Sequence, residues 1–271
     1  MRQILDRRLV KRSFSRAART YDSAAGLQRE VATSVAGLLS AKPGAVLDVG
    51  CGTGAAVEFI ERLHPGSKVY GCDIAVSMLE VAKEKLNGRS PALIGADCTH
   101  LPFMDAAFDT VVSSLTFQWI TDLEAAFREA WRVLRPGGLF CFSTLGRATM
   151  HELRLSIEEA ERRTGRNGLP EPLSFRDAAE IKTILERAGF GEIESTVEEK
   201  KKCYKGLAEL LRTLKKIGAT NPNPGGTDSL LRGTLLKAAA GIYEEMFPAG
   251  EEGGIRATYQ VVLVRARKQR T

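Results

Sequence analysis

The chain has 271 residues, of which 44% are hydrophobic and 27% charged, and it carries a formal net charge of +6 at pH 7. This size and composition predict one substantial hydrophobic core with an added subdomain, rather than two full domains. No apolar run approaches the roughly 18 residues that a membrane-spanning helix needs, and the charged N-terminus lacks the apolar segment of a signal peptide. We therefore expect a monomeric, cytoplasmic protein that makes no membrane contact.

The cysteines and histidines suggest neither a disulfide framework nor a metal site. The five cysteines are odd in number, widely spaced and without a CxxC pair: Cys51, Cys72, Cys98, Cys141 and Cys203. His64, His100 and His151 show no spacing typical of metal ligands. A reducing compartment and no bound metal are therefore expected.

Basic residues are concentrated at the N-terminus. Residues 1–20 hold seven Lys or Arg and one acidic residue, Asp6, so the rest of the chain is balanced in charge. Such a segment can attract an acidic macromolecule, whether nucleic acid, an anionic membrane or an acidic carrier protein, or it can be the solvated face of a helix. Val10, Phe14, Ala17 and Tyr21 recur at helical spacing, which favours a helix that packs on the protein.

The first forty residues are expected to form helices placed before a sheet, because a second apolar stripe continues to Leu38 and is followed by Pro43 and Gly44. Strands and helices then alternate. Strands are predicted near 45–49, 68–72, 91–95, 109–114 and 138–145, and helices near 54–63, 76–86 and 122–134. This alternation predicts an α/β fold with a doubly wound, mostly parallel sheet.

The second half of the chain breaks this alternation. Helices are predicted near 151–163 and 175–188, with a strand near 191–203 and a final strand near 258–266 that brings the strand number to seven. Between these last strands the sequence predicts an amphipathic helix that ends at Gly218, a turn-rich loop over 219–228 and a helix near 229–246. We expect 219–228 to be a disordered linker, and the insertion as a whole to determine substrate specificity.

A glycine-rich turn follows the first predicted strand. The run is Val46-Leu47-Asp48-Val49-Gly50-Cys51-Gly52-Thr53-Gly54, with three glycines at two-residue spacing after an apolar segment. Glycine reaches the positive φ angles of a tight strand-to-helix turn and lets a ligand approach the backbone, while the following helix offers unpaired N–H groups. The run therefore predicts a nucleotide-binding site.

Two classes of nucleotide fit this turn. Gly50-x-Gly52-x-x-Ala55 also matches the dinucleotide fingerprint, and Asp73 supplies the acid expected about 20 residues on under either interpretation. An acid just before the glycines, Asp48, suits a cationic ligand with a sulfonium and an α-ammonium better than a pyrophosphate. Four candidates fall at the carboxyl ends of predicted strands, where such sheets bind ligands: Gly50, Asp73, Asp97 and Ser114.

Further motifs follow in the order typical of one superfamily. They are Gly95-Ala96-Asp97-Cys98, Leu101-Pro102-Phe103, Phe108-Asp109 and Arg132-Val133-Leu134-Arg135-Pro136-Gly137-Gly138. With the glycine turn, this order resembles the class I S-adenosylmethionine-dependent methyltransferases. The resemblance implies a Rossmann-like fold and S-adenosylmethionine as the cofactor. The chain then divides into an N-terminal helical cap (1–40), a cofactor-binding core (41–204 and 255–271) and a helical substrate-lid insertion (205–254).

The resemblance also implies a set of cofactor contacts. Asp73 would accept hydrogen bonds from both ribose hydroxyls, Asp97 and Cys98 would lie near the adenine edge, and Asp48 would act near the ammonium through water or backbone. The remaining candidates form the glycine turn, the apolar walls for adenine and the end of the fourth strand: Gly50, Cys51, Gly52, Gly54, Ile74, Met78 and Ser114. Ser114 stands where such motifs often carry Asn.

Several further segments carry a narrower signature. They are Phe14-Ser15-Arg16-Ala17-Ala18-Arg19-Thr20-Tyr21-Asp22, Leu27-Gln28, Ser113-Ser114-Leu115-Thr116-Phe117-Gln118-Trp119, Phe142-Ser143-Thr144-Leu145 and Leu211-Arg212-Thr213-Leu214-Lys215-Lys216-Ile217-Gly218-Ala219. Covering nearly the whole chain, they resemble the malonyl-carrier-protein O-methyltransferases of biotin synthesis. The resemblance implies methyl transfer to the free carboxylate of a malonyl thioester, on an acidic acyl-carrier protein or on coenzyme A. The methyl ester then primes biotin (pimeloyl) synthesis.

The chemistry implied by this resemblance needs few catalytic groups. A malonyl carboxylate is ionised at pH 7, so no general base is required, and the rate comes from positioning the reactants and excluding water. A cation can orient the carboxylate, and Arg212 is the first candidate, followed by Lys215. Both also fit a solvated basic face. Tyr21, Gln118 and Trp119 are expected on the substrate side, with ordinary packing as the alternative for Tyr21 and Trp119.

Other functions remain open at this point. A quinone-ring methyltransferase shares the glycine turn, but the insertion helix argues against it. A nucleic-acid methyltransferase that acts on amino groups usually has an Asn/Asp-Pro-Pro-aromatic run after the fourth strand, where this chain has Ser113-Ser114-Leu115-Thr116. We therefore expect no nucleic-acid partner. A noncatalytic cofactor-sensing module is the third alternative.

Overall fold

The computed structural model describes residues 5–40, 42–86, 92–167, 169, 173–220, 229–250 and 253–270, with the backbone alone for 229–232. Within these residues, seven strands form one sheet in the order β3-β2-β1-β4-β5-β7-β6. They are β1 (Ala45–Val49), β2 (Lys68–Asp73), β3 (Leu93–Gly95), β4 (Phe108–Ser114), β5 (Leu134–Leu145), β6 (Phe190–Tyr204) and β7 (Ile255–Lys268). Strands β1 to β5 pair in parallel, and β7 is antiparallel to both β5 and β6. The predicted doubly wound, mostly parallel sheet is confirmed.

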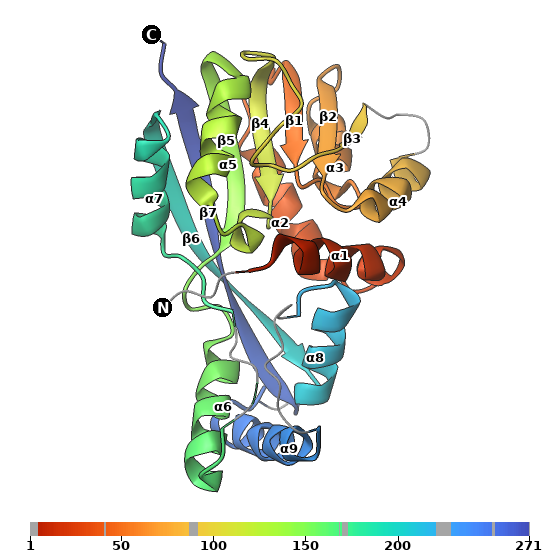
Figure 1. Cartoon of the computed structure of the whole chain (residues 1–271), viewed down its shortest axis with the longest axis vertical. Helices are drawn as coiled ribbons and strands as arrows, with labels where there is room; N and C mark the ends of the chain where they lie inside the picture. The colour runs from red at the N-terminus through yellow and green to blue at the C-terminus, as the bar shows by residue number, and fades with distance from the viewer. Residues whose placement is uncertain are drawn as a thin grey trace.

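Helices cover both faces of this sheet (Figure 1). They are α1 (Arg7–Tyr21), α2 (Gly26–Gly37), α3 (Ala55–Leu63), α4 (Val76–Leu86), α5 (Leu123–Val133), α6 (His151–Thr164), α7 (Ala178–Arg187), α8 (Leu207–Lys216) and α9 (Ser229–Met246), with a short 3-10 helix, η1 (Phe117–Trp119). Neighbouring residues of one strand enter opposite core clusters: Val112 joins the cluster of α2 and α3, and Val111 that of α5 and α7. Burial on both faces is typical of parallel strands. No helix in the described ranges is long and apolar enough to cross a membrane.

Strands β6 and β7 continue past the end of β5 and carry a second group of helices (Figure 1). Pairing of β5 with β7 stops at Leu145↔Val261, whereas β6 and β7 stay paired as far as Tyr204↔Ile255. We call this extension, together with α6, α8 and α9, the lobe. The buried carboxylate of Glu152, in the first turn of α6, accepts hydrogen bonds from the N–H (3.1 Å) and the hydroxyl of Thr258. These bonds fix α6 on β7.

Helix α1 connects the sheet to the lobe. The hydroxyl of Thr20 donates to the carbonyl oxygen of Lys216 at 2.9 Å, which joins α1 to the end of α8. The hydroxyl of Thr53, in the glycine turn, donates to Oδ1 of Asp22 at 2.6 Å. Both bonds lie at the C-terminal end of α1, so this end is fixed between the turn and the lobe.

A few element boundaries differ from the sequence-based expectations. The helix expected from residue 175 begins at Ala178, because Asp177 and Glu180 form a capping box. The last strand begins at Ile255 rather than near 258, because its first residues pair with the end of β6. Part of the loop expected to be a linker, 221–228, lies outside the described residues, as do Pro170 and Pro172. The division into cap, core and lid stays a prediction.

Candidate active site

The glycine turn joins β1 to α3 in a conformation that favours glycine. Gly50, Gly52 and Gly54 have φ angles of 71°, 53° and 82°. A Cβ atom at Gly50 would lie 2.3 Å from the side chain of Thr116, so alanine has no room there. At Gly52 nothing lies within 4 Å of the corresponding position. This glycine therefore faces open space from which a ligand can approach the backbone.

Asp73, at the end of β2, holds the turn in place. Its Oδ2 accepts a hydrogen bond from the N–H of Gly52 at 3.0 Å, and its Oδ1 accepts one from the N–H of Ala75 at 2.7 Å. Burial raises the pKa of Asp73, and the two backbone hydrogen bonds oppose that rise. A carboxylate oxygen can accept more than one bond, so Asp73 can hold the backbone and also accept from two ligand hydroxyls.

Asp48 is a buried carboxyl group without a partner. Its side chain on β1 is 1% exposed, and neither carboxyl oxygen has a hydrogen-bond partner among the described residues. Burial, reinforced by the charge of Asp73, raises the pKa of Asp48 to about 8. A group of this kind becomes ionised readily only when a positive charge lies close by. In the part of the chain that the structure describes, no three His, Cys, Asp or Glu side chains converge on a possible metal position.

A pocket, here called the loop pocket, lies against the glycine turn. Eight of the eleven residues predicted to bind cofactor line it: Gly50, Gly52, Asp73, Ile74, Met78, Asp97, Cys98 and Ser114. Asp48, Cys51 and Gly54 do not line it. The structure brings the eight together; their contacts with a cofactor stay predictions.

Helix α1 forms one wall of the loop pocket. Arg7, Val10, Phe14 and Tyr21 all line it, and Arg7 makes an ion pair with Asp97. Of these four residues, only Tyr21 was predicted from the sequence to lie at the active site. Arg7 is one of seven basic residues near the N-terminus, and nothing in the local pattern distinguishes it from the others.

A larger cavity, the lobe cavity, lies between the sheet and the lobe and has a volume of about 670 Å³. Four residues line both it and the loop pocket: Phe14, Tyr21, Leu115 and Trp119. We call these four the junction. The rings of Phe14 and Trp119 meet edge to face with their centroids 5.2 Å apart. The two cavities therefore adjoin at these four side chains.

Leu115, in the junction, has a strained backbone. Its φ angle is 50°, which is uncommon for a residue other than glycine. The N–H of Leu115 donates to Oγ of Ser143 at 3.0 Å and to the carbonyl oxygen of Ser143 at 3.2 Å. The surrounding structure thus enforces the conformation, as is common where strands end at functional sites.

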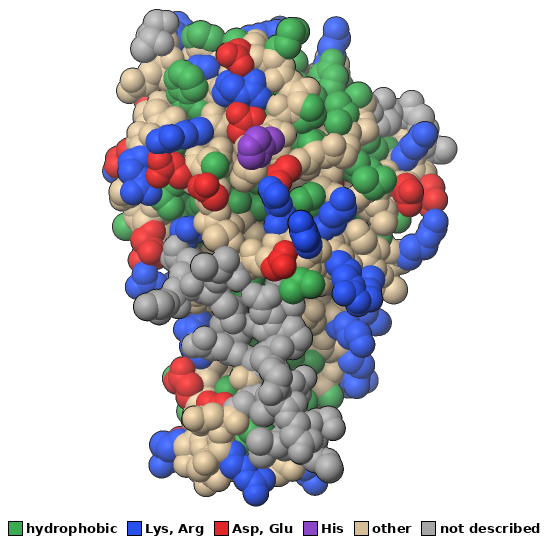
Figure 2. Space-filling model, viewed as in Figure 1, with side chains coloured by type: hydrophobic (Ala, Val, Ile, Leu, Met, Phe, Trp, Pro, Cys, Tyr) green, Lys and Arg blue, Asp and Glu red, His purple; other side chains and the backbone are tan. Residues whose placement is uncertain are grey.

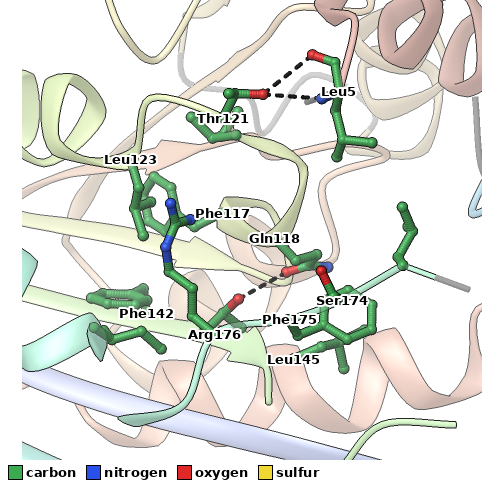
Figure 3. A pocket seen from close by; sticks show the side chains of 14 residues that line it. Leu5, Phe117, Gln118, Thr121, Leu123, Phe142, Leu145, Ser174, Phe175 and Arg176 are labelled. Atoms are coloured by element: carbon green, nitrogen blue, oxygen red, sulfur yellow. Dashed lines mark hydrogen bonds between the residues drawn. The ribbon is translucent and has the colours of Figure 1, made fainter. Parts of the chain in front are cut away.

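Gln118 lies between the lobe cavity and a smaller side pocket of about 280 Å³ (Figure 3). Its Nε2 donates to the carbonyl oxygen of Leu115 at 2.6 Å, and its Oε1 accepts from the hydroxyl of Thr144 at 3.3 Å. Both ends of the amide are therefore held. The guanidinium of Arg176 reaches toward Phe117 on the other side of this pocket (Figure 3).

The two candidate cations are placed differently. Both side chains are exposed, but Lys215 lines the lobe cavity, whereas Arg212 lines none of the three cavities. Neither side chain makes an ion pair with any residue that the structure describes. Arg212 was the first candidate from the sequence for the cation that orients the carboxylate. In the structure Lys215, and not Arg212, lines the lobe cavity. Their roles stay predictions.

The raised pKa of Asp48 predicts a pH-dependent stability. The folded, ligand-free protein keeps this carboxyl protonated up to about pH 8, while the unfolded chain releases the proton near pH 3.8. Asp48 therefore costs stability progressively as the pH rises between these values. Replacing Asp48→Asn should raise the free energy of unfolding relative to the parent, with the gain growing by at most about 1.4 kcal/mol per pH unit. Urea unfolding at pH 5, 6.5 and 8 measures this; parallel profiles for the two proteins would contradict it.

Comparisons with known proteins agree with this geometry. The methyltransferase domain family matches residues 47–142, which hold the glycine turn and Asp73. The malonyl-[acyl-carrier protein] O-methyltransferase of Geobacter sulfurreducens is 36% identical over 263 residues, covering 96% of this chain and 98% of that protein. The biotin biosynthesis bifunctional protein BioHC of Saccharophagus degradans is 37% identical over 254 residues, covering 93% of this chain and 45% of that longer protein.

A solved structure supports the fold. Phosphoethanolamine N-methyltransferase 2 of Haemonchus contortus, in complex with S-adenosyl-L-methionine, is 18% identical with a TM-score of 0.58, covering 94% of this chain and 57% of that chain. At this identity the likeness concerns the fold alone. The Geobacter protein is matched over almost its whole length, and the chain therefore belongs to the malonyl-[acyl-carrier protein] O-methyltransferase family.

Proposed function

We propose that this protein transfers a methyl group from S-adenosylmethionine to the free carboxylate of a malonyl thioester, giving a methyl ester that primes biotin (pimeloyl) synthesis. The junction carries the proposal. It separates the loop pocket, which eight of the predicted cofactor residues line, from a cavity that Lys215 lines. A cationic donor and an anionic acceptor can meet across it, as the reaction requires. The name of the Geobacter relative supports the choice of substrate, and the name of the Saccharophagus relative supports the link to biotin synthesis.

The residues of the loop pocket fit S-adenosylmethionine. The cofactor supplies a methyl group on a positively charged sulfur, and the unpartnered carboxyl of Asp48 offsets positive charge near the turn. Asp73 has acceptor capacity left for the ribose hydroxyls. Arg7 lines this pocket and forms an ion pair with Asp97, a residue that we expect near the adenine edge.

The protein positions the two reactants and excludes water from them, and it supplies no general acid or base. A carboxylate has a reference pKa near 4 and is already the nucleophile at pH 7. Phe14, Leu115 and Trp119 exclude water from the junction, while Gln118 stands beside Trp119 with its amide oriented by Leu115 and Thr144. Holding the reactants in a near-attack arrangement is then the main source of rate.

Lys215 is the cation that we assign to the carboxylate, because it lines the lobe cavity and has no described ion-pair partner. A lysine at this place attracts the carboxylate without removing its charge. Arg212, one turn earlier on α8, lies on the outside. We assign it to the anionic part of the substrate that stays at the surface.

Helices α1 and α8 carry a basic surface next to the lobe cavity. It consists of exposed cations on α1 and α8 that make no ion pair with described residues: Arg8, Lys11, Arg12, Arg16, Arg212, Lys215 and Lys216. Figure 2 shows Lys and Arg side chains gathered along the side of the molecule where these two helices lie. The bond from Thr20 to Lys216 keeps the helices together. Such a surface fits an acidic carrier protein better than a small neutral substrate.

The proposal is tested by following the mass of the carrier. Purified protein is incubated with S-adenosylmethionine and malonyl-carrier protein, with acetyl- and succinyl-carrier as controls. We expect a gain of one methyl group on the malonyl-carrier and none on the acetyl-carrier, which has no free carboxylate. If cofactor binding is demonstrated but no malonyl thioester is methylated, on carrier or on coenzyme A, the proposal is wrong and a quinone-ring or sensor function takes its place.

The two cations are separated by matched substitutions. Lys215→Met should lower kcat/KM for malonyl-coenzyme A by about tenfold, the usual cost of losing a charged hydrogen bond, and leave the Kd for S-adenosylmethionine unchanged. Arg212→Met should lower kcat/KM for malonyl-coenzyme A by less than Lys215→Met does. Steady-state kinetics and calorimetric titration of the cofactor measure these quantities. The opposite ranking would restore Arg212 as the group that holds the carboxylate.

The basic surface predicts a salt-dependent association. The double substitution Lys11→Gln and Arg12→Gln should lower kcat/KM for malonyl-carrier protein several-fold at low ionic strength, with kcat unchanged, and should weaken the salt dependence. Lys182→Gln, an exposed lysine on α7, is the control and should change neither. A parent enzyme whose kcat/KM does not fall with added salt would rule out electrostatic docking.

A further inference from the structure

The lobe cavity is larger and more apolar than a malonyl group requires. Its volume of about 670 Å³ lies within the range of sites that enclose drug-sized ligands. Most of its lining is aliphatic or aromatic, including Met150, Leu153, Ile157, Leu214 and Leu236. A malonyl group is short and polar, so it accounts for only one end of this space.

The described residues that α6 and α9 contribute to the cavity are aliphatic. Leu153 and Ile157 come from α6 and Leu236 from α9, two helices that pack together at the end of the lobe (Figure 1). The hydroxyl of Tyr259, which also lines the cavity, already bonds the hydroxyl of Tyr204 at 2.9 Å. Burying amide groups among such side chains leaves them unpaired, whereas an aliphatic chain loses nothing.

The near end of the cavity has the opposite character. Lys215 lines it without a described ion-pair partner, and the amide of Gln118 lies beside the junction. A single cavity therefore carries a cation at one end and an aliphatic lining at the other. Its chemical complement is an unbranched chain that ends in a carboxylate.

We propose that the lobe cavity binds saturated medium-chain monocarboxylates, with the carboxylate toward Lys215 and the chain between α6 and α9. Because the malonyl carboxylate of the proposed function uses the same end of the cavity, these acids compete with the malonyl thioester. The competition rests on the proposed function, whereas the binding site itself does not.

The site is tested first by binding, on the full-length protein without cofactor. Calorimetric titrations use hexanoate, octanoate and decanoate below the concentrations at which they form micelles. Each added methylene should tighten the Kd by about three- to fourfold, the value for transfer of a methylene out of water. Octanol should bind more weakly than octanoate, and Lys215→Met should weaken octanoate by about tenfold without affecting octanol.

A pair of matched substitutions on α6 tests where the aliphatic chain of the acid binds. Leu153→Trp fills the cavity, whereas Leu155→Trp places the same ring two residues away on α6, at a side chain that is 41% exposed. Leu153→Trp should raise the Kd for decanoate more than tenfold, and Leu155→Trp should leave this Kd unchanged. Leu236→Trp, on the facing helix, is the replacement if Leu153→Trp does not fold.

The outcomes separate this inference from the proposed function. Octanoate and decanoate should act as competitive inhibitors of malonyl-carrier methylation by the parent protein. Equal affinities along the acid series, equal effects of the two α6 substitutions, or bound acid that does not compete would each overturn the inference while malonyl methylation stands. Chain-length-dependent binding in a protein that methylates no malonyl thioester would retain the site and remove the proposed function.

Discussion

The hydrogen bond from Thr53 to Asp22, 2.6 Å long, joins the glycine turn to the end of α1. Lys85 of α4 lies 3.3 Å from Asp22 and 3.6 Å from Glu58, so charges from two further helices surround the same point. Tyr21 precedes Asp22 in the chain and lies in the junction. Because α1 is fixed here, one helix forms a wall of both cavities, and the position of the reacting groups follows from the position of that helix.

Charge is distributed to match this geometry. The carboxyl groups of Asp48 and Asp73 lie at the carboxyl ends of strands, on the side of the loop pocket. The unpaired cations of α1 and α8 lie on the outer side, with Lys215 reaching the lobe cavity. Under the proposed function, Asp73 lies on the side of the cationic cofactor and Lys215 on the side of the anionic substrate. The apolar junction between them, where the local dielectric is low, strengthens both interactions.

The fold could be predicted from the sequence because hydrophobic periodicity and the conformational preferences of glycine depend on neighbouring residues in the chain. Alternating strands and helices predicted the sheet, and the turn at Gly50 admits no other residue beside Thr116. The site followed only in part. Arg212 and Lys215 lie three residues apart on α8, and which of them reaches a cavity depends on how the stripe of Leu211 and Leu214 packs. Spacing along one helix cannot decide this.

The lobe cavity could not be predicted from the sequence either, because it depends on how distant elements pack. Its lining comes from helices and loops that are distant in the chain, and its volume is what remains after α6, α8 and α9 have packed around β6 and β7. An amphipathic stripe shows that a helix buries one face. It does not show whether that face meets a full core or an open space. The strained φ of Leu115 is similarly set by Ser143 rather than by residue type.

Three cysteine thiols lie in or beside the loop pocket, where burial favours their protonated form. Cys72 and Cys98 line the pocket and Cys51 lies in the turn. Burial is the main cause that raises the pKa of each thiol, for Cys98 to about 12, and neighbouring acidic groups add to the rise. The thiolate is the nucleophilic form, so these cysteines are inert at neutral pH, whereas a substrate carboxylate is fully ionised. Under the proposed function, methyl transfer is directed to the substrate by protonation state as well as by position.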